Sequence, residues 1–97
     1  MLFTFYILDA PGTAGKRLSL RPKQYAHLGK VEDRILTGGP LLADDGETMI
    51  GSLLVIDFPD RQAAESWLAE APFTTAGVFG NAAIHPYKQN WPRARLP

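Results

Sequence analysis

Two apolar runs separated by a polar turn constrain the fold of this 97-residue chain most strongly. Residues 35–42 and 49–58 are rich in Leu, Ile and Val, which favours strands. Residues 43–48 between them are acidic and contain a glycine, which is typical of a turn. The pattern therefore predicts two paired strands, the first of them bent at Gly38-Gly39.

A strand and a helix are predicted before this pair. Residues 2–8 combine aromatic, Ile and Thr side chains as strands do, and a loop over 12–17 follows. Pro22 suits the first turn of a helix, because its missing N–H costs little there. Apolar residues then recur at helical spacing, which predicts one buried face: Tyr25, Leu28, Val31 and Ile35.

A second helix and a last strand are predicted after the pair. Asp60 is a good N-cap, and the helix that it begins ends at Pro72. The apolar side chains of this helix share one face: Ala63, Ala64, Trp67 and Leu68. Residues 73–77 predict a turn, either irregular or a short helical one. Residues 78–87 predict an edge strand that contains a proline, and residues 90–97 predict a C-terminal tail.

The order strand, helix, strand, strand, helix, strand is the split βαβ pattern of ferredoxin-like folds. It predicts a single α+β domain over residues 1–97, with a four-stranded antiparallel sheet and two helices on one face. Both faces of the first strand are apolar, since Phe3, Phe5 and Ile7 alternate with Leu2, Tyr6 and Leu8. Two helices cover only one face, so the other predicts a homodimer whose sheets face each other. The space between helices and sheet is the natural place for a pocket.

Composition argues against several classes of function. Ten basic and ten acidic residues give a formal net charge of zero, whereas nucleic-acid binding requires a basic surface. The absence of cysteine excludes disulfides, and two histidines without nearby acidic spacing make a metal site unexpected. Gly38-Gly39-Pro40 enters no helix, which argues against a phosphate-binding loop, and no cofactor is expected. The apolar start is short and lacks a basic leader, so no signal peptide or membrane span is expected and a cytoplasmic protein is predicted.

Several short motifs, taken together, resemble one known family. They are Arg17-Leu18-Ser19-Leu20-Arg21-Pro22, Gly39-Pro40, Asp45-Gly46, Gly51-Ser52-Leu53-Leu54-Val55, Ala71-Pro72-Phe73, Gly77-Val78-Phe79 and Ile84-His85-Pro86. In this order and spacing, over about residues 3–87, the chain resembles the YCII-related (YciI-like) proteins. The resemblance implies a dimeric α+β barrel of two ferredoxin-like protomers, in agreement with the fold predicted from the pattern.

The chain departs from the family where the resemblance implies chemistry. Members usually carry Arg-x-x-His at the start of the first helix and Asp-Pro-Tyr/Phe after the second. The His and Asp are regarded as a catalytic dyad, and one member is a dehydrochlorinase acting on a chlorinated hydroxyquinone. Here Gln24 stands in the place of the His and Ala71 in the place of the Asp. Gln cannot act as a general base and Ala cannot orient one, so the dyad is not carried over.

The predicted pocket is formed around these two positions. Its expected lining is Arg21, Gln24, His27, Ser52, Ala71 and Phe73, with Gly39 and Pro40 shaping one wall. His27 lies one helical turn after Gln24 and is either a relocated general base or a partly exposed structural histidine. Arg21, at the predicted helix start, is poorly placed against the helix dipole, which indicates a partner: an anionic ligand or a carboxylate such as Asp9.

Three functions are compatible with this set of residues. The first is binding of a small anionic or aromatic metabolite, with weak catalysis or none. The second is a lyase or dehydrochlorinase-type enzyme that uses His27 as its base. The third is a non-catalytic structural subunit that dimerises within a larger assembly. A cavity beside Gln24 distinguishes the first two from the third.

Overall fold

The computed structural model describes residues 1–92, and its strands and two long helices follow the predicted order. The elements are β1 (Leu2–Asp9), α1 (Ala14–Gly29), the short 3₁₀ helix η1 (Glu32–Arg34), β2 (Ile35–Leu42), β3 (Met49–Asp57), α2 (Arg61–Glu70), α3 (Pro72–Thr75) and β4 (Phe79–Tyr87). The strands form one antiparallel sheet in the order β2-β3-β1-β4. The predicted α+β ferredoxin-like fold is therefore confirmed. Most of the predicted tail, residues 93–97, lies outside the described residues.

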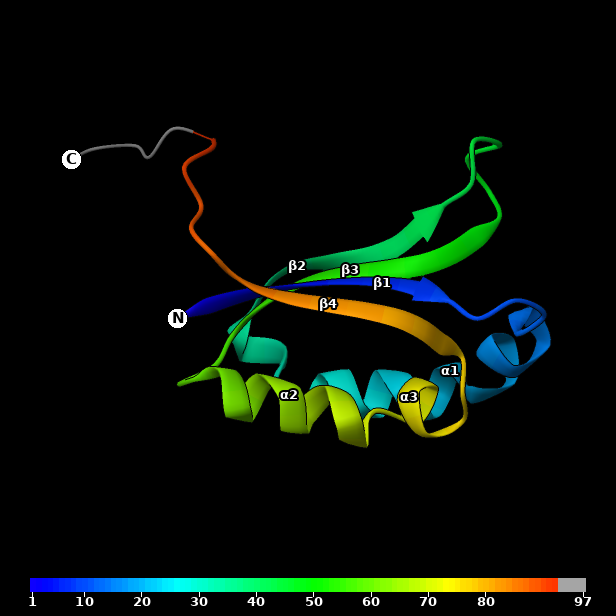
Figure 1. The fold of residues 1–97 in the computed structure, drawn as a ribbon, viewed down its shortest axis with the longest axis horizontal. Coiled ribbons are helices and arrows are strands. Elements are labelled where there is room, and N and C mark those ends of the chain that lie inside the picture. Colours follow the sequence, from blue (N-terminus) through cyan, green and yellow to red (C-terminus); the bar gives the residue numbers. More distant parts are fainter. Residues whose placement is uncertain (93–97) are drawn as a thin grey trace.

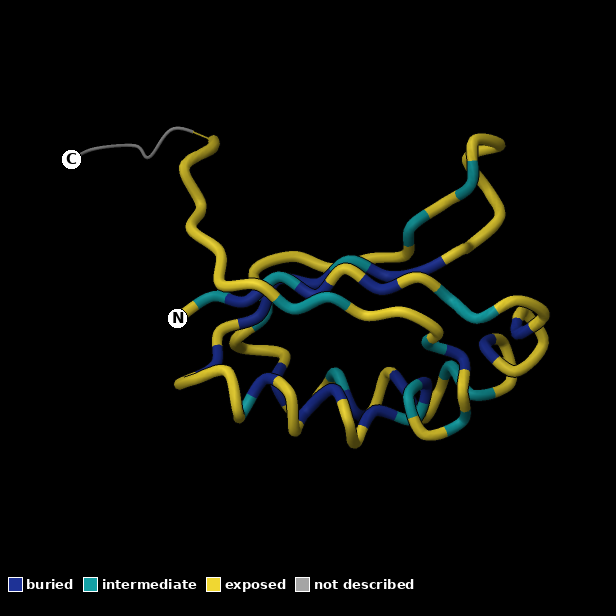
Figure 2. The backbone as a smooth tube through the Cα atoms, viewed as in Figure 1, coloured by how far each residue is buried: buried dark blue, intermediate teal, exposed yellow. Residues whose placement is uncertain are grey.

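The helices lie on one side of the sheet (Figure 1) and form the core with its central strands. Buried positions concentrate in β1, β3 and the sheet-facing sides of the helices, whereas β2 and β4 are exposed edge strands (Figure 2). Phe3, Phe5 and Ile7 alternate along β1 and all point toward the helices, because strand side chains alternate between faces. Phe5 packs edge-to-face on Trp67 of α2, with ring centroids 5.5 Å apart, which fixes α2 against the sheet.

The start of α2 is as predicted, and a short helix follows it. The Asp60 side chain accepts a hydrogen bond from the backbone N–H of Ala63 at 2.8 Å, which confirms the N-cap. The chain is extended at Ala71, and Pro72 begins α3, so the turn predicted here takes its short helical form. Gly77, at φ 77°, then adopts a left-handed conformation that glycine tolerates, and β4 begins two residues later.

The predicted start of the first helix is wrong, because α1 begins at Ala14 rather than near Pro22. The backbone N–H of Arg17 already donates to the Thr13 carbonyl at 2.9 Å, so helical bonding runs through the predicted loop. Pro22 lies in the helix interior and leaves the Leu18 carbonyl without its usual N–H partner. Leu18 itself is 63% exposed, so it lies on the solvent-facing side of α1.

The buried face of α1 is also different from the predicted apolar face. The buried side chains of this helix are Arg17, Gln24 and His27. Tyr25 is 62% exposed, and Val31 and Ile35 lie beyond the end of the helix. Polar groups can be buried here because each has a hydrogen-bond partner. Across residues 1–92, no helix combines the length and the apolar character needed to traverse a bilayer.

A glycine allows β1 and β3 to approach closely beside the site. Gly51 lies opposite Leu8, and a Cβ at Gly51 would collide with the carbonyl of Ile7. The next residue, Ser52, pairs with Ile7 and therefore shares its face of the sheet, toward the helices. The opposite face presents Tyr6 at 47% exposure, and the homodimer predicted through that face stays a prediction.

Candidate functional site

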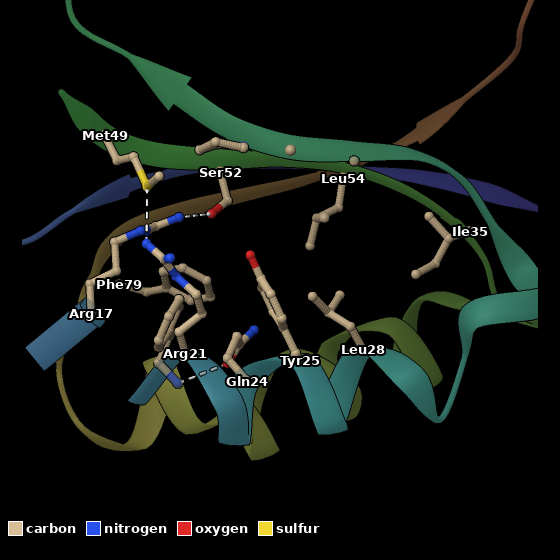
Figure 3. Close-up of a pocket in the computed structure, with 14 residues that line it drawn as sticks. Arg17, Arg21, Gln24, Tyr25, Leu28, Ile35, Met49, Ser52, Leu54 and Phe79 are labelled. Carbon is tan, nitrogen blue, oxygen red and sulfur yellow. Dashed lines mark hydrogen bonds between the residues drawn. The ribbon is translucent and has the colours of Figure 1, made fainter. Parts of the chain in front are cut away.

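A cavity of about 330 Å³ lies between α1 and the sheet (Figure 3). This volume is at the small end of the range for ligand sites and suits a molecule of about one ring. Its polar lining comes from Arg17, Arg21, Gln24 and Ser52, and the phenol side chain of Tyr25 also lines it. The remaining lining is mainly apolar: Leu28, Ile35, Gly38, Gly39, Pro40, Met49, Leu54, Phe73 and Phe79.

Arg17 is a buried cation whose charge is compensated. Its Nη1 lies 2.9 Å from both carboxylate oxygens of Asp9, and both side chains are about nine-tenths buried. Its Nη2 donates to the Ser52 hydroxyl at 3.0 Å and to the Gly51 carbonyl at 3.3 Å. The guanidinium also lies over the Phe73 ring, with its carbon 5.1 Å from the centroid. The carboxylate expected as a partner of Arg21 is therefore engaged by Arg17 instead.

Arg21, one helical turn further along α1, has no such partner. Its Nη2 lies 3.9 Å from the Met49 sulfur, a weak acceptor (Figure 3). The structure gives Arg21 no carboxylate partner within residues 1–92, and no acidic residue of that part of the chain lines the cavity. The cavity therefore contains one uncompensated positive charge.

Gln24 joins α1 to α3 at the edge of the cavity. Its Oε1 accepts the backbone N–H of Phe73 at 3.0 Å, and the residue is only 3% exposed. Because the carbonyl end of the amide is engaged in this way, the Nε2 end points toward the cavity (Figure 3). Gln24 therefore connects α1 to α3 through a hydrogen bond between two neutral groups, neither of which titrates.

Two of the predicted site residues lie away from the cavity. Ala71 is fully buried and its carbonyl accepts the N–H groups of Thr74 and Thr75, at 2.9 and 3.0 Å. His27 is 5% exposed, and its ring stacks on Trp67 with centroids 4.8 Å apart. Neither Ala71 nor His27 lines the cavity, so the expected place of each in the pocket is wrong.

The environment of His27 is that of a structural side chain. Its Nε2 lies 2.8 Å from the carbonyl oxygen of Trp67. A carbonyl only accepts, so this nitrogen carries the proton and is unavailable as a base. The prediction of a partly exposed histidine is also wrong, because the stacking on Trp67 buries the ring.

The other predicted residues do lie at the cavity: Arg21, Gln24, Ser52, Phe73, Gly39 and Pro40. The sequence reasoning missed Tyr25 as a site residue, because it placed this side chain in the apolar core. Arg17, Arg21 and Tyr25 follow one another at intervals of four residues and therefore share one side of α1. This spacing would have indicated a polar stripe if the helix had been predicted to begin before Arg17.

Comparison with known proteins agrees with this architecture. A family model for the YCII-related domain matches residues 1–88. An uncharacterized protein of Haemophilus influenzae is 34% identical, over 92% of this chain and 98% of the relative. Protein YciI of Escherichia coli O6:H1 is 33% identical with the same shares. The solved structure of 5-chloro-2-hydroxyhydroquinone dehydrochlorinase (TftG) of Burkholderia phenoliruptrix AC1100, in complex with 2,5-dihydroxybenzoquinone, is similar at a TM-score of 0.84 and 30% identity, covering 91% of this chain and 94% of that one. The match over residues 1–88 and these relatives show that the chain belongs to the YCII-related family.

Proposed function

We propose that the cavity between α1 and the sheet binds a small planar organic anion. The observation that carries this proposal is the contrast between two arginines four residues apart. Arg17 is neutralised by Asp9, whereas Arg21 reaches the cavity without a carboxylate partner within residues 1–92. A bound anion would compensate this charge in a partly enclosed site, where charge pairing is stronger than in bulk water.

The other polar groups at the cavity also favour an anion, because they are placed to donate. Gln24 uses its carbonyl on Phe73 and is left with its NH₂ group. Ser52 accepts a hydrogen bond from Arg17, so its own O–H remains available to donate. Arginine and the amide NH₂ can only donate. A lining of donors is complementary to carboxylate, enolate or quinone oxygens.

The walls of the cavity and the structural neighbour support a planar ring. Phe73 and Phe79 pack edge-to-face with centroids 5.5 Å apart and line the cavity together with Leu54. TftG was solved with 2,5-dihydroxybenzoquinone, a planar ring with acidic hydroxyl groups. We infer from these two observations that the ligand of this chain is of similar size and charge.

A dehydrochlorinase-type reaction is the second candidate, and the similarity to TftG favours it. It requires a group that accepts a proton from the substrate. Gln24 does not titrate, and the Nε2 of His27 is held by the Trp67 carbonyl outside the cavity. The side chains that line the cavity thus support binding better than proton transfer.

The test is isothermal titration of the protein with 2,5-dihydroxybenzoquinone and with benzoate. Arg21→Gln should weaken both by about 10- to 100-fold, the range for one hydrogen bond to a charged group. Lys23→Gln is the matched control, because it removes the same charge from an exposed position of the same helix that does not line the cavity. The proposal is wrong if the wild type binds neither probe, or if the two variants bind equally well.

A further inference from the structure

Tyr25 stands at the cavity with an unused hydroxyl group. The side chain is 62% exposed, yet it lines the cavity, and its hydroxyl oxygen points from α1 toward the sheet (Figure 3). The structure gives this hydroxyl no hydrogen-bond partner within residues 1–92. Nothing in the packing of the fold therefore requires a phenol here rather than a plain aromatic ring.

Tyr25 lies close enough to Arg21 for one ligand to contact both side chains. The two residues are four apart on α1, so their Cβ atoms are about 5–6 Å apart on the same side of the helix. A ring whose anionic oxygen pairs with Arg21 extends along the helix toward Tyr25. Its far end then lies between the phenol and the apolar side chains Leu28 and Leu54.

The free-energy cost of leaving the Tyr25 hydroxyl unpaired would make the cavity selective between ligands. In the free protein, water can satisfy the exposed hydroxyl of Tyr25. A ligand that fills the cavity displaces this water, and an apolar end would leave the hydroxyl without a partner, whereas a second oxygen accepts its hydrogen bond.

We infer that Tyr25 determines specificity by donating to a second oxygen of the ligand. The cavity then takes rings that carry oxygen at two ends, such as ionised hydroxyquinones, in preference to rings with one anionic group. This inference rests on the proposed anion site at Arg21 and adds the chemical class that the site selects.

The experiment compares two probes in three proteins by isothermal titration. 2,5-Dihydroxybenzoquinone carries oxygen on four ring carbons, so an oxygen faces Tyr25 however the ring is turned, whereas benzoate carries one carboxylate only. Tyr25→Phe should weaken binding of the quinone about tenfold, whereas benzoate should bind at least as tightly as to wild type, because its apolar end no longer leaves a hydroxyl unpaired. Tyr6→Phe removes the same hydroxyl from the opposite face of the sheet and should change neither.

Each alternative outcome is decisive. Equal quinone affinity in Tyr25→Phe and wild type overturns the role of Tyr25, and the proposed anion site still stands if Arg21→Gln weakens binding. Equal weakening of both probes by Tyr25→Phe also overturns it, because the hydroxyl then does not distinguish a ligand with a second oxygen from one without. Failure of the wild type to bind either probe overturns the anion site, and this inference with it.

Discussion

The side-chain carbonyl of Gln24 accepts the backbone N–H of Phe73 across 3.0 Å, and this bond is buried. It joins α1 to α3 at the cavity, at the position where the family resemblance implies a histidine. The same side chain therefore has two functions in this chain: its oxygen holds α3 in place and its nitrogen faces the cavity.

Replacement of Gln24 by a side chain of similar shape without a carbonyl should destabilise the fold. Gln24→Met leaves the Phe73 N–H buried without an acceptor, which costs about 1–3 kcal/mol of unfolding free energy. In a domain of this size the melting temperature falls by about 4–8 °C per kcal/mol. Thermal denaturation followed by circular dichroism measures this shift. Gln62→Met, on the exposed side of α2, should stay within about 0.5 kcal/mol of wild type, and an equal stability of the two variants contradicts the prediction.

Loss of the carboxylate that neutralises Arg17 should change stability and affinity in opposite directions. Asp9→Asn leaves a guanidinium that is about nine-tenths buried without its counter-charge, which costs about 3–5 kcal/mol. The cavity then contains two uncompensated cations, so it should bind 2,5-dihydroxybenzoquinone more tightly. Thermal denaturation with and without this probe measures both effects, and the shift caused by the probe should be larger in the variant.

The matched control for Asp9→Asn is Asp57→Asn. Asp57 pairs with the N-terminal amine at 2.7 Å, but its side chain is 57% exposed, so the loss should be at most about 1 kcal/mol. An Asp9→Asn variant that is as stable as Asp57→Asn, or that binds the probe more weakly than wild type, contradicts the prediction.

The fold could be predicted from the sequence because its signals are local. The alternation of Phe3, Phe5 and Ile7, and the glycine-bearing turn after β2, depend only on neighbouring residues. The start of α1 gave no such signal. The Thr13 hydroxyl donates to the Ala10 carbonyl instead of capping the helix, and no acidic residue occupies the first turn.

The site was less predictable because its contacts join distant parts of the chain. Gln24 and Phe73 are 49 residues apart, and Arg17 and Ser52 are 35 residues apart. The hydrophobic periodicity of the sequence does not indicate whether Arg17 or Arg21 pairs with Asp9. That pairing depends on where α1 begins relative to the end of β1. The residue types at the cavity could be inferred from the sequence, whereas their pairing required the structure.

The β2–β3 turn should show one carboxyl group that titrates at unusually low pH. Hydrogen bonds from the Thr48 hydroxyl and from the N–H groups of Thr48 and Glu47 lower the pKa of Asp45 from 3.8 to about 2. Because the folded pKa lies below the unfolded one, the stabilisation is complete above about pH 4 and is lost as the pH falls toward 2.

The titration of Asp45 can be followed by NMR of its carboxyl carbon. The wild-type midpoint should be about 2, and Thr48→Val, which removes the hydroxyl donor, should move it upward toward 3.8. A wild-type midpoint near 3.8 would mean that the turn does not hold these hydrogen bonds in solution.

The uncovered face of the sheet should make the protein a homodimer. Tyr6 and Leu8 project from β1 on the side away from the helices, at 47% and 36% exposure, and Leu53 lies opposite Tyr6 on that face. A second copy that presents the same face would bury these apolar side chains by two-fold symmetry. Light scattering should therefore give twice the mass of one chain. Tyr6→Lys should give the monomer mass, because dimerisation would bury its charge without a partner.

Leu18→Lys is the control for this substitution. Leu18 is 63% exposed on α1, so the same new charge there should leave the dimer intact. If the wild type scatters as a single chain, the facing-sheet arrangement is wrong. If Tyr6→Lys remains a dimer while Leu18→Lys dissociates, the interface lies on the helices instead of the sheet.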